Sequence, residues 1–168
     1  MWEKLKSLFK GRSRKRRINM YKEKEYEYLL HAFRIPEEPA GFINLDEGDI
    51  LQLNCGETVF LYESPLASSA EEAIAMAKRA AKKMRPAPDR AVLLTVLTII
   101  AGYNLYNLDL IEQLANPLTE EAFSEDTDVI FSTQFSDEKG IRFVMATAEG
   151  KHGSSPFLMS PAQVKPER

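Results

Sequence analysis

Hydrophobic and polar positions change their spacing several times along the chain, and each spacing predicts a different element. Residues 90–101 are nearly all apolar and rich in β-branched side chains, which is typical of a central strand covered on both faces. Residues 128–135 and 141–148 alternate between apolar and polar, and the turn-forming residues 137–140 separate them. This pattern predicts two further strands joined as an antiparallel hairpin. A fourth strand is expected over residues 57–62, which are β-branched and aromatic.

Apolar residues at spacings of three and four predict the helices. Asp46 is expected to cap a short helix over residues 46–53, with Asp49 three positions on. Ser69 opens a longer helix with an alanine-rich face; Glu72 completes a capping box, and prolines at 86 and 88 end the helix. A third helix follows Gly102, with an apolar stripe at Leu105, Leu108, Ile111, Leu114 and Ala115. A further short helix over residues 21–33 should pack on the domain through Tyr26, Leu29, Leu30 and Phe33.

These elements predict an α/β (α+β) fold: a four-stranded mixed sheet with two main helices on one face, preceded by an N-terminal helical arm. Right-handed crossovers between neighbouring parallel strands place both helices on the same side. We divide the chain into an arm (1–20), a short helix with a linker (21–40), a domain (41–150) and a flexible tail (151–168).

Charge changes the picture at the N-terminus. The net charge of the 168 residues is −3, yet residues 1–17 hold eight bases and one acid, so an acidic body carries a basic arm. The arm's apolar residues share one helical face beside lysines, followed by a polybasic run, as interfacial membrane helices require. The residues expected to contact an anionic membrane are Trp2, Lys4, Leu5, Lys6, Leu8, Phe9, Lys10, Arg12, Arg14, Lys15, Arg16 and Arg17.

Two other interpretations of the arm stay open. It could dock on its own domain or a partner, or bind nucleic acid through phosphates. The acidic body and the lack of interleaved aromatic and basic residues weigh against nucleic acid. No apolar run is long enough to span a bilayer and no secretory signal is expected, so we place the protein in the cytoplasm, peripheral on the inner face of the cell membrane. The single cysteine, Cys55, excludes an intramolecular disulfide and fits a reducing compartment.

Five fragments in order resemble the C-terminal domain of the FtsZ/tubulin family. Residues 41–49 (GFINLDEGD) are similar to the family's catalytic-loop pattern Asn-x-Asp-x-x-Asp after Gly-x-Ile, with Glu47-Gly48 in place of Phe-Ala. The other fragments are a helix start and three strands: 69–73 (SAEEA), 92–96 (VLLTV), 128–131 (DVIF) and 141–150 (IRFVMATAEG).

The resemblance implies a partner-binding loop made of Asn44, Asp46 and Asp49. In the family this loop projects from one subunit into the nucleotide pocket of the next, where its acids help to position the attacking water. The alternative is that Asp46 and Asp49 only cap a helix. These 168 residues contain no glycine-rich phosphate loop and no Walker A pattern, so the chain is not expected to bind GTP by itself.

The sequence therefore favours a membrane-associated, non-GTPase protein that binds FtsZ or a homologous tubulin-like filament and regulates or tethers its assembly. A self-associating scaffold module that no longer contacts FtsZ, and so a homo-oligomer, is the alternative. An enzyme in its own right is not expected, because no nucleophile–base pair, metal cluster or cofactor loop is visible. His31 and His152 have no ligand spacing to Cys55, so no metal and no cofactor are predicted.

Overall fold

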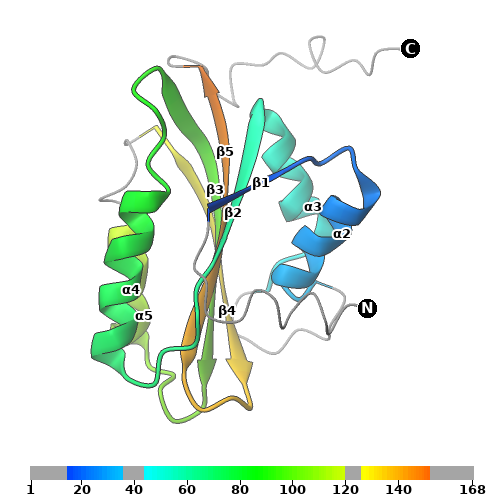
Figure 1. The fold of residues 1–168 in the computed structure, drawn as a ribbon. Coiled ribbons are helices and arrows are strands. Elements are labelled where there is room, and N and C mark those ends of the chain that lie inside the picture. The colour runs from blue at the N-terminus through cyan, green and yellow to red at the C-terminus, as the bar shows by residue number, and fades with distance from the viewer. Residues whose placement is uncertain (1–14, 36–43, 120–125, 152–168) are drawn as a thin grey trace.

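A mixed five-stranded sheet forms the centre of the computed structural model, which describes residues 15–35, 44–119 and 126–151 (Figure 1). Its strand order is β1 (Lys15–Ile18), β2 (Thr58–Glu63), β5 (Ile141–Lys151), β3 (Arg90–Gly102) and β4 (Asp128–Ser136). β3 pairs parallel with β4 and antiparallel with β5, and the β2–β5 and β1–β2 pairs are antiparallel. The predicted mixed sheet is confirmed, but its predicted size of four strands is wrong because β1 adds a fifth.

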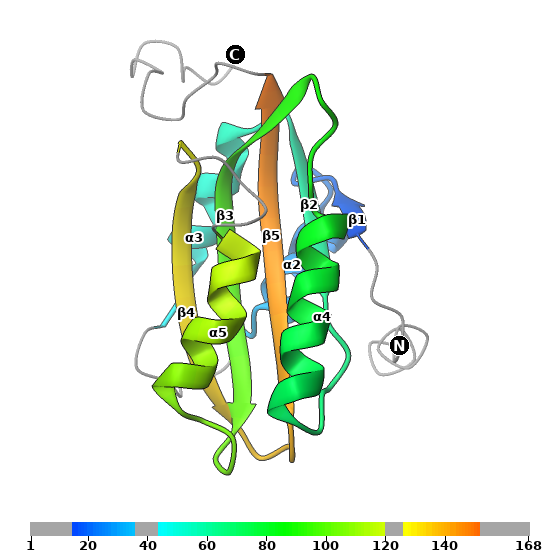
Figure 2. The same ribbon diagram turned by 90° about the vertical axis from the view of Figure 1, so that its left-hand side faces the viewer.

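Helices cover both faces of the sheet, as Figures 1 and 2 show from two sides. The two main helices, α4 (Ala70–Lys83) and α5 (Leu108–Thr119), lie on the same face, as predicted. The other face carries α2 (Glu23–Ala32), α3 (Glu47–Leu51) and a 3-10 turn, η1 (Gln52–Cys55). The second layer forms because β3 and β5 expose apolar side chains on both sides.

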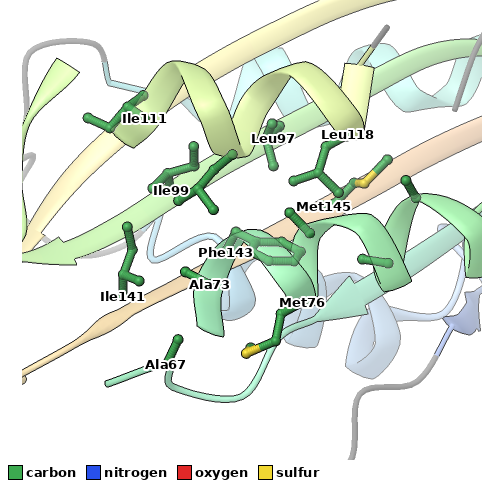
Figure 3. Close-up of a cluster of buried hydrophobic side chains, with 14 of the residues drawn as sticks. Ala67, Ala73, Met76, Leu97, Ile99, Ile111, Leu118, Ile141, Phe143 and Met145 are labelled. Atoms are coloured by element: carbon green, nitrogen blue, oxygen red, sulfur yellow. The ribbon is translucent and has the colours of Figure 1, made fainter. Parts of the chain in front are cut away.

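Alternate residues of the two central strands build two separate cores. Leu97 and Ile99 of β3 lie with Phe143 and Met145 of β5 under α4 and α5 (Figure 3). The intervening residues Leu94, Val96, Ile100, Val144, Ala146 and Ala148 pack under α2, α3 and η1. The period of two along a strand sends successive side chains to opposite faces, so one nearly continuous apolar run supplies both cores.

The predicted hairpin of β4 and β5 is wrong, because β3 lies between these two strands. Ala101 of β3 is opposite Phe135 of β4 on one side and Ile141 of β5 on the other. Residues 137–140 therefore cross the end of β3, where the Gly102 amide donates to the Gly140 carbonyl oxygen at 2.7 Å. A Cβ on Gly102 would lie 2.3 Å from the Glu138 carbonyl oxygen, so the crossing requires glycine there.

Two predicted helix starts also differ in detail. α5 begins at Leu108 because the Leu110 amide donates to the Asn107 side chain at 2.8 Å, which leaves Leu105 before the helix and Leu108 72% exposed. Its buried stripe consists of Leu110, Ile111, Leu114, Pro117 and Leu118. At α4, the Ser69 side chain accepts from the Glu72 amide as predicted, but the Glu72 carboxylate accepts from the Ser68 amide and hydroxyl. The predicted reciprocal capping box is thus only half formed.

Candidate functional site

The loop before α3 holds its two aspartates in a reciprocal capping box. The Asp49 amide donates to Asp46 Oδ1 at 2.9 Å, and the Asp46 amide donates to Asp49 Oδ2 at 3.0 Å. These bonds satisfy orphan donors at the start of a helix that is only one turn long. Each carboxylate uses one oxygen in this pair, so capping leaves its second oxygen available for another partner.

The apolar side chains of the same loop are buried in the core, and its polar side chains are exposed to solvent. Leu45 and Ile50 are buried in the core under α2, whereas Asn44 and Asp46 are exposed. Because buried apolar residues flank the acids, the loop is held in place while its polar atoms face solvent. The predicted partner-binding residues Asn44, Asp46 and Asp49 thus lie together on an accessible turn.

Glu47, the third acid beside Asp46 and Asp49, is hydrogen-bonded to a tyrosine of α2. Tyr26 donates its hydroxyl to Glu47 Oε1 at 2.6 Å. Burial first, and the bond and charge of Glu47 next, raise the pKa of Tyr26 to about 12, so the phenol keeps its proton and remains a donor. The bond turns the Glu47 carboxylate toward α2 and ties α2 to the start of α3.

Three of the predicted membrane-binding residues form β1, and two of them already have partners within the domain. Lys15 Nζ lies 3.2 Å from Glu149 Oε1, 3.4 Å from the Arg85 carbonyl oxygen and 4.2 Å from the centre of the Phe60 ring. The Arg16 guanidinium stacks over Tyr28, 4.5 Å from the ring centre, while Arg17 is exposed. The remaining predicted contacts, Trp2, Lys4, Leu5, Lys6, Leu8, Phe9, Lys10, Arg12 and Arg14, lie outside the described residues.

The other candidate groups stand apart from the loop. Cys55 is half-buried beside the core under α2, and burial, followed by the nearby charge of Asp128, raises the pKa of its thiol. Burial and the raised pKa both suppress the nucleophilic thiolate form. Across residues 15–35, 44–119 and 126–151, no three His, Cys, Asp or Glu side chains gather to hold a metal ion. None of the helices in those ranges is long and apolar enough to cross a membrane.

Neither protein-family models nor curated proteins match the sequence, but solved structures do. In a helical model of the TubZ-Bt four-stranded filament, the TubZ chain is 12% identical over 74% of this chain and 33% of that one, with a TM-score of 0.54. TubZ of Bacillus thuringiensis serovar israelensis, in GDP-form protofilaments, is 13% identical over 88% of this chain and 39% of that one, with a TM-score of 0.53. The protein has the fold of part of an FtsZ/tubulin-type subunit.

This FtsZ/tubulin-type fold confirms the resemblance drawn from the sequence. An FtsZ mutant from M. jannaschii also matches, with 17% identity over 79% of this chain and 42% of that one and a TM-score of 0.48. The chain spans 33% and 39% of the length of the two TubZ chains. The similar fragments fall at the Asp46 loop, the start of α4, and strands β3, β4 and β5.

The sequence analysis missed one ion pair and one hydrogen bond within the domain. Glu149 is an acid at a 4% exposed position of a strand whose residues are otherwise mostly apolar or small, a signal that a cation must lie nearby. Lys15 is that cation, and it comes from a segment assigned to the arm. The Tyr26–Glu47 bond joins two predicted helices, and periodicity alone does not indicate which of their polar residues meet.

Proposed function

We propose that this protein is a peripheral membrane protein, not itself a GTPase, that binds an FtsZ- or TubZ-type filament and regulates or tethers it. The observation that carries the proposal is the exposed Asn44–Asp49 loop, built on a fold that TubZ shares in its filament. The resemblance to FtsZ implies that such a loop meets the nucleotide-bearing end of the next subunit. The basic arm would supply the membrane contact.

The chemistry of the loop fits docking at a nucleotide pocket. Each aspartate keeps one oxygen outside the capping box, and a positioned carboxylate can orient the water that attacks a γ-phosphate. Because Glu47 accepts a hydrogen bond from Tyr26, its carboxylate already has a partner on α2. The interface is heterologous, so a unit that contributes only the loop side would terminate a filament end.

The test separates the charge of the loop from its capping role. Full-length protein is mixed with an FtsZ- or TubZ-type partner and GTP, and polymer mass and phosphate release are measured. In the variant Asp46→Asn/Asp49→Asn, both amides can still accept the capping bonds, so folding should be retained while the effect on the polymer falls at least about tenfold. The matched control, Asp109→Asn/Glu112→Gln, removes two exposed charges from α5 and should behave as the unchanged protein.

Unchanged polymer mass, turnover and co-sedimentation with the unmodified protein would refute filament binding.

A second candidate function, self-association as a scaffold, is favoured by β4. This strand has nine residues, and no described residue pairs with its outer edge. Such an edge is a template for strand pairing between copies. Light scattering would support the scaffold if it finds a stable dimer that is indifferent to the filament protein.

A further inference from the structure

The exposed side of the last two turns of α4 is cationic. Lys78, Arg79 and Lys82 lie on these two turns, Arg85 follows two residues after the end of the helix, and all four are exposed. We call these four residues the basic ridge. The sequence contains no acid between Glu72 and Asp89, and within α4 Arg79 interacts with Glu72, whose pKa is lowered first by hydrogen bonds from Ser68 and then by the charge of Arg79.

The basic ridge lies where the N-terminal arm joins the domain. Lys15, the first residue of β1, donates to the carbonyl oxygen of Arg85, the last residue of the ridge. Residues 1–14, which precede Lys15 directly, carry five further bases and one acid. Any surface that the arm binds is therefore brought next to the basic ridge. Because the arm holds that surface nearby, the effective concentration for a second contact at the ridge is high.

The two faces of the sheet differ in their charge. The layer of α4 and α5 carries the basic ridge together with the exposed acids Glu71, Glu72, Asp109 and Glu112, whereas acids dominate the opposite layer. The layer opposite α4 and α5 carries the acids of α2 and the loop acids of α3: Glu23, Glu25, Glu27, Asp46, Glu47 and Asp49, against the cations Lys22 and Lys24. Figure 1 shows α4 and this layer on opposite sides of the strands. An anionic surface would thus attract the ridge and repel the opposite face.

We propose that the basic ridge is a second membrane contact, which binds anionic lipid headgroups and fixes the orientation of the domain. The inference rests on the proposed membrane association of the arm. It adds that the domain lies with the C-terminal end of α4 against the bilayer, so the Asp46 loop faces away from the lipid and toward a filament. The ridge contains no aromatic side chain on which a base could stack, which favours lipid over single-stranded nucleic acid.

The test is vesicle flotation of the full chain with phosphatidylglycerol-containing and pure phosphatidylcholine vesicles over a range of salt. The ridge variant is Lys78→Gln/Arg79→Gln/Lys82→Gln/Arg85→Gln. Its control, Lys22→Gln/Lys24→Gln/Lys139→Gln/Lys151→Gln, neutralises four exposed lysines elsewhere on the domain. Circular dichroism and urea unfolding check that both variants fold. Since each basic residue near such a surface adds on the order of 1 kcal/mol, the ridge variant should lose at least about tenfold in vesicle affinity.

Each outcome distinguishes the two proposals. A ridge variant that is weakened with a shallower salt dependence, beside a control within about twofold of the unchanged protein, supports the inference. Equal binding by ridge variant and control would overturn it and leave the arm as the membrane contact. If the unchanged protein binds neither vesicle, membrane association itself fails. Binding to double-stranded DNA that depends on the ridge, without vesicle binding, would identify a nucleic-acid surface and would also overturn it.

Discussion

The ion pair of Lys15 and Glu149 should decide whether β1 stays on the sheet. β1 has only four residues and lies at an edge, so its backbone bonds to β2 are exposed to competition from water. Replacing Lys15 by Met keeps most of the apolar stem beside Phe60 but removes the ammonium group. The carboxylate of Glu149, whose side chain is 5% exposed, would then be left without a cation.

The magnitude follows from the burial of the two partners. Breaking a buried ion pair on one side costs about 3–5 kcal/mol, because the remaining charge is desolvated and unpaired. The Lys15 side chain is 23% exposed, so water can partly solvate the Glu149 carboxylate once the ammonium group is removed. We therefore expect a loss of about 2 kcal/mol in the free energy of unfolding. Glu149→Gln, which leaves no stranded charge on the strand, should cost less than Lys15→Met. The double variant should cost less than the sum of the two.

Urea unfolding of the four proteins gives the double-mutant cycle, and hydrogen exchange reports on β1 itself. The expected coupling between Lys15 and Glu149 is about 1–2 kcal/mol, and the β1 amides that bond to β2 should lose protection in Lys15→Met. A loss below about 0.5 kcal/mol, which is the usual size for an exposed pair, would refute the reasoning. Protection of the β1 amides that is unchanged in Lys15→Met would refute it as well.

Three further predictions follow from single contacts. Gly56→Ala should lower the free energy of unfolding by about 1–3 kcal/mol, because the new Cβ would lie 2.9 Å from the carbonyl carbon of Ala148 and 2.9 Å from the amide nitrogen of Glu149; an unchanged urea midpoint would contradict this. Ser69→Ala should cost about 1 kcal/mol by removing the N-cap of α4, and Ser69→Asp, which restores a capping oxygen, should recover it in the same assay. Burial and the bond to Glu63 raise the pKa of Tyr28 above its ordinary value of 10.0, so stability from this group is complete below that pH and is lost as pH rises through the folded pKa. Glu63→Gln should shift this loss of stability toward pH 10.0. The titration of Tyr28 is followed by ultraviolet absorbance, and stability by unfolding at alkaline pH. A Tyr28 titration that does not move would show that the Glu63 carboxylate has no role.

The sequence was most informative where one local signal was sufficient. The apolar run at 90–101 predicted β3 within a residue or two, since only a strand covered on both faces needs apolar side chains in both directions. The capping box of Asp46 and Asp49 was also visible, because its partners are three residues apart. The same local reasoning was wrong at Leu108. Its helical spacing from Ile111 predicted a core position, but the bond from the Leu110 amide to the Asn107 side chain starts the helix at Leu108 and leaves this residue exposed.

By itself, then, the sequence determined the identity of the elements from β2 to β5, most of the faces they bury and the resemblance to the FtsZ/tubulin fold. Only the tertiary structure decided which strands are neighbours: that β3 separates β4 from β5, and that Lys15 to Ile18 leave the arm to become β1. The physical reason is that periodicity records which side of an element meets apolar surroundings, over a few residues. Strand pairing and the meeting of Lys15 with Glu149, 134 positions away, depend on which distant groups best satisfy one another once the chain is compact.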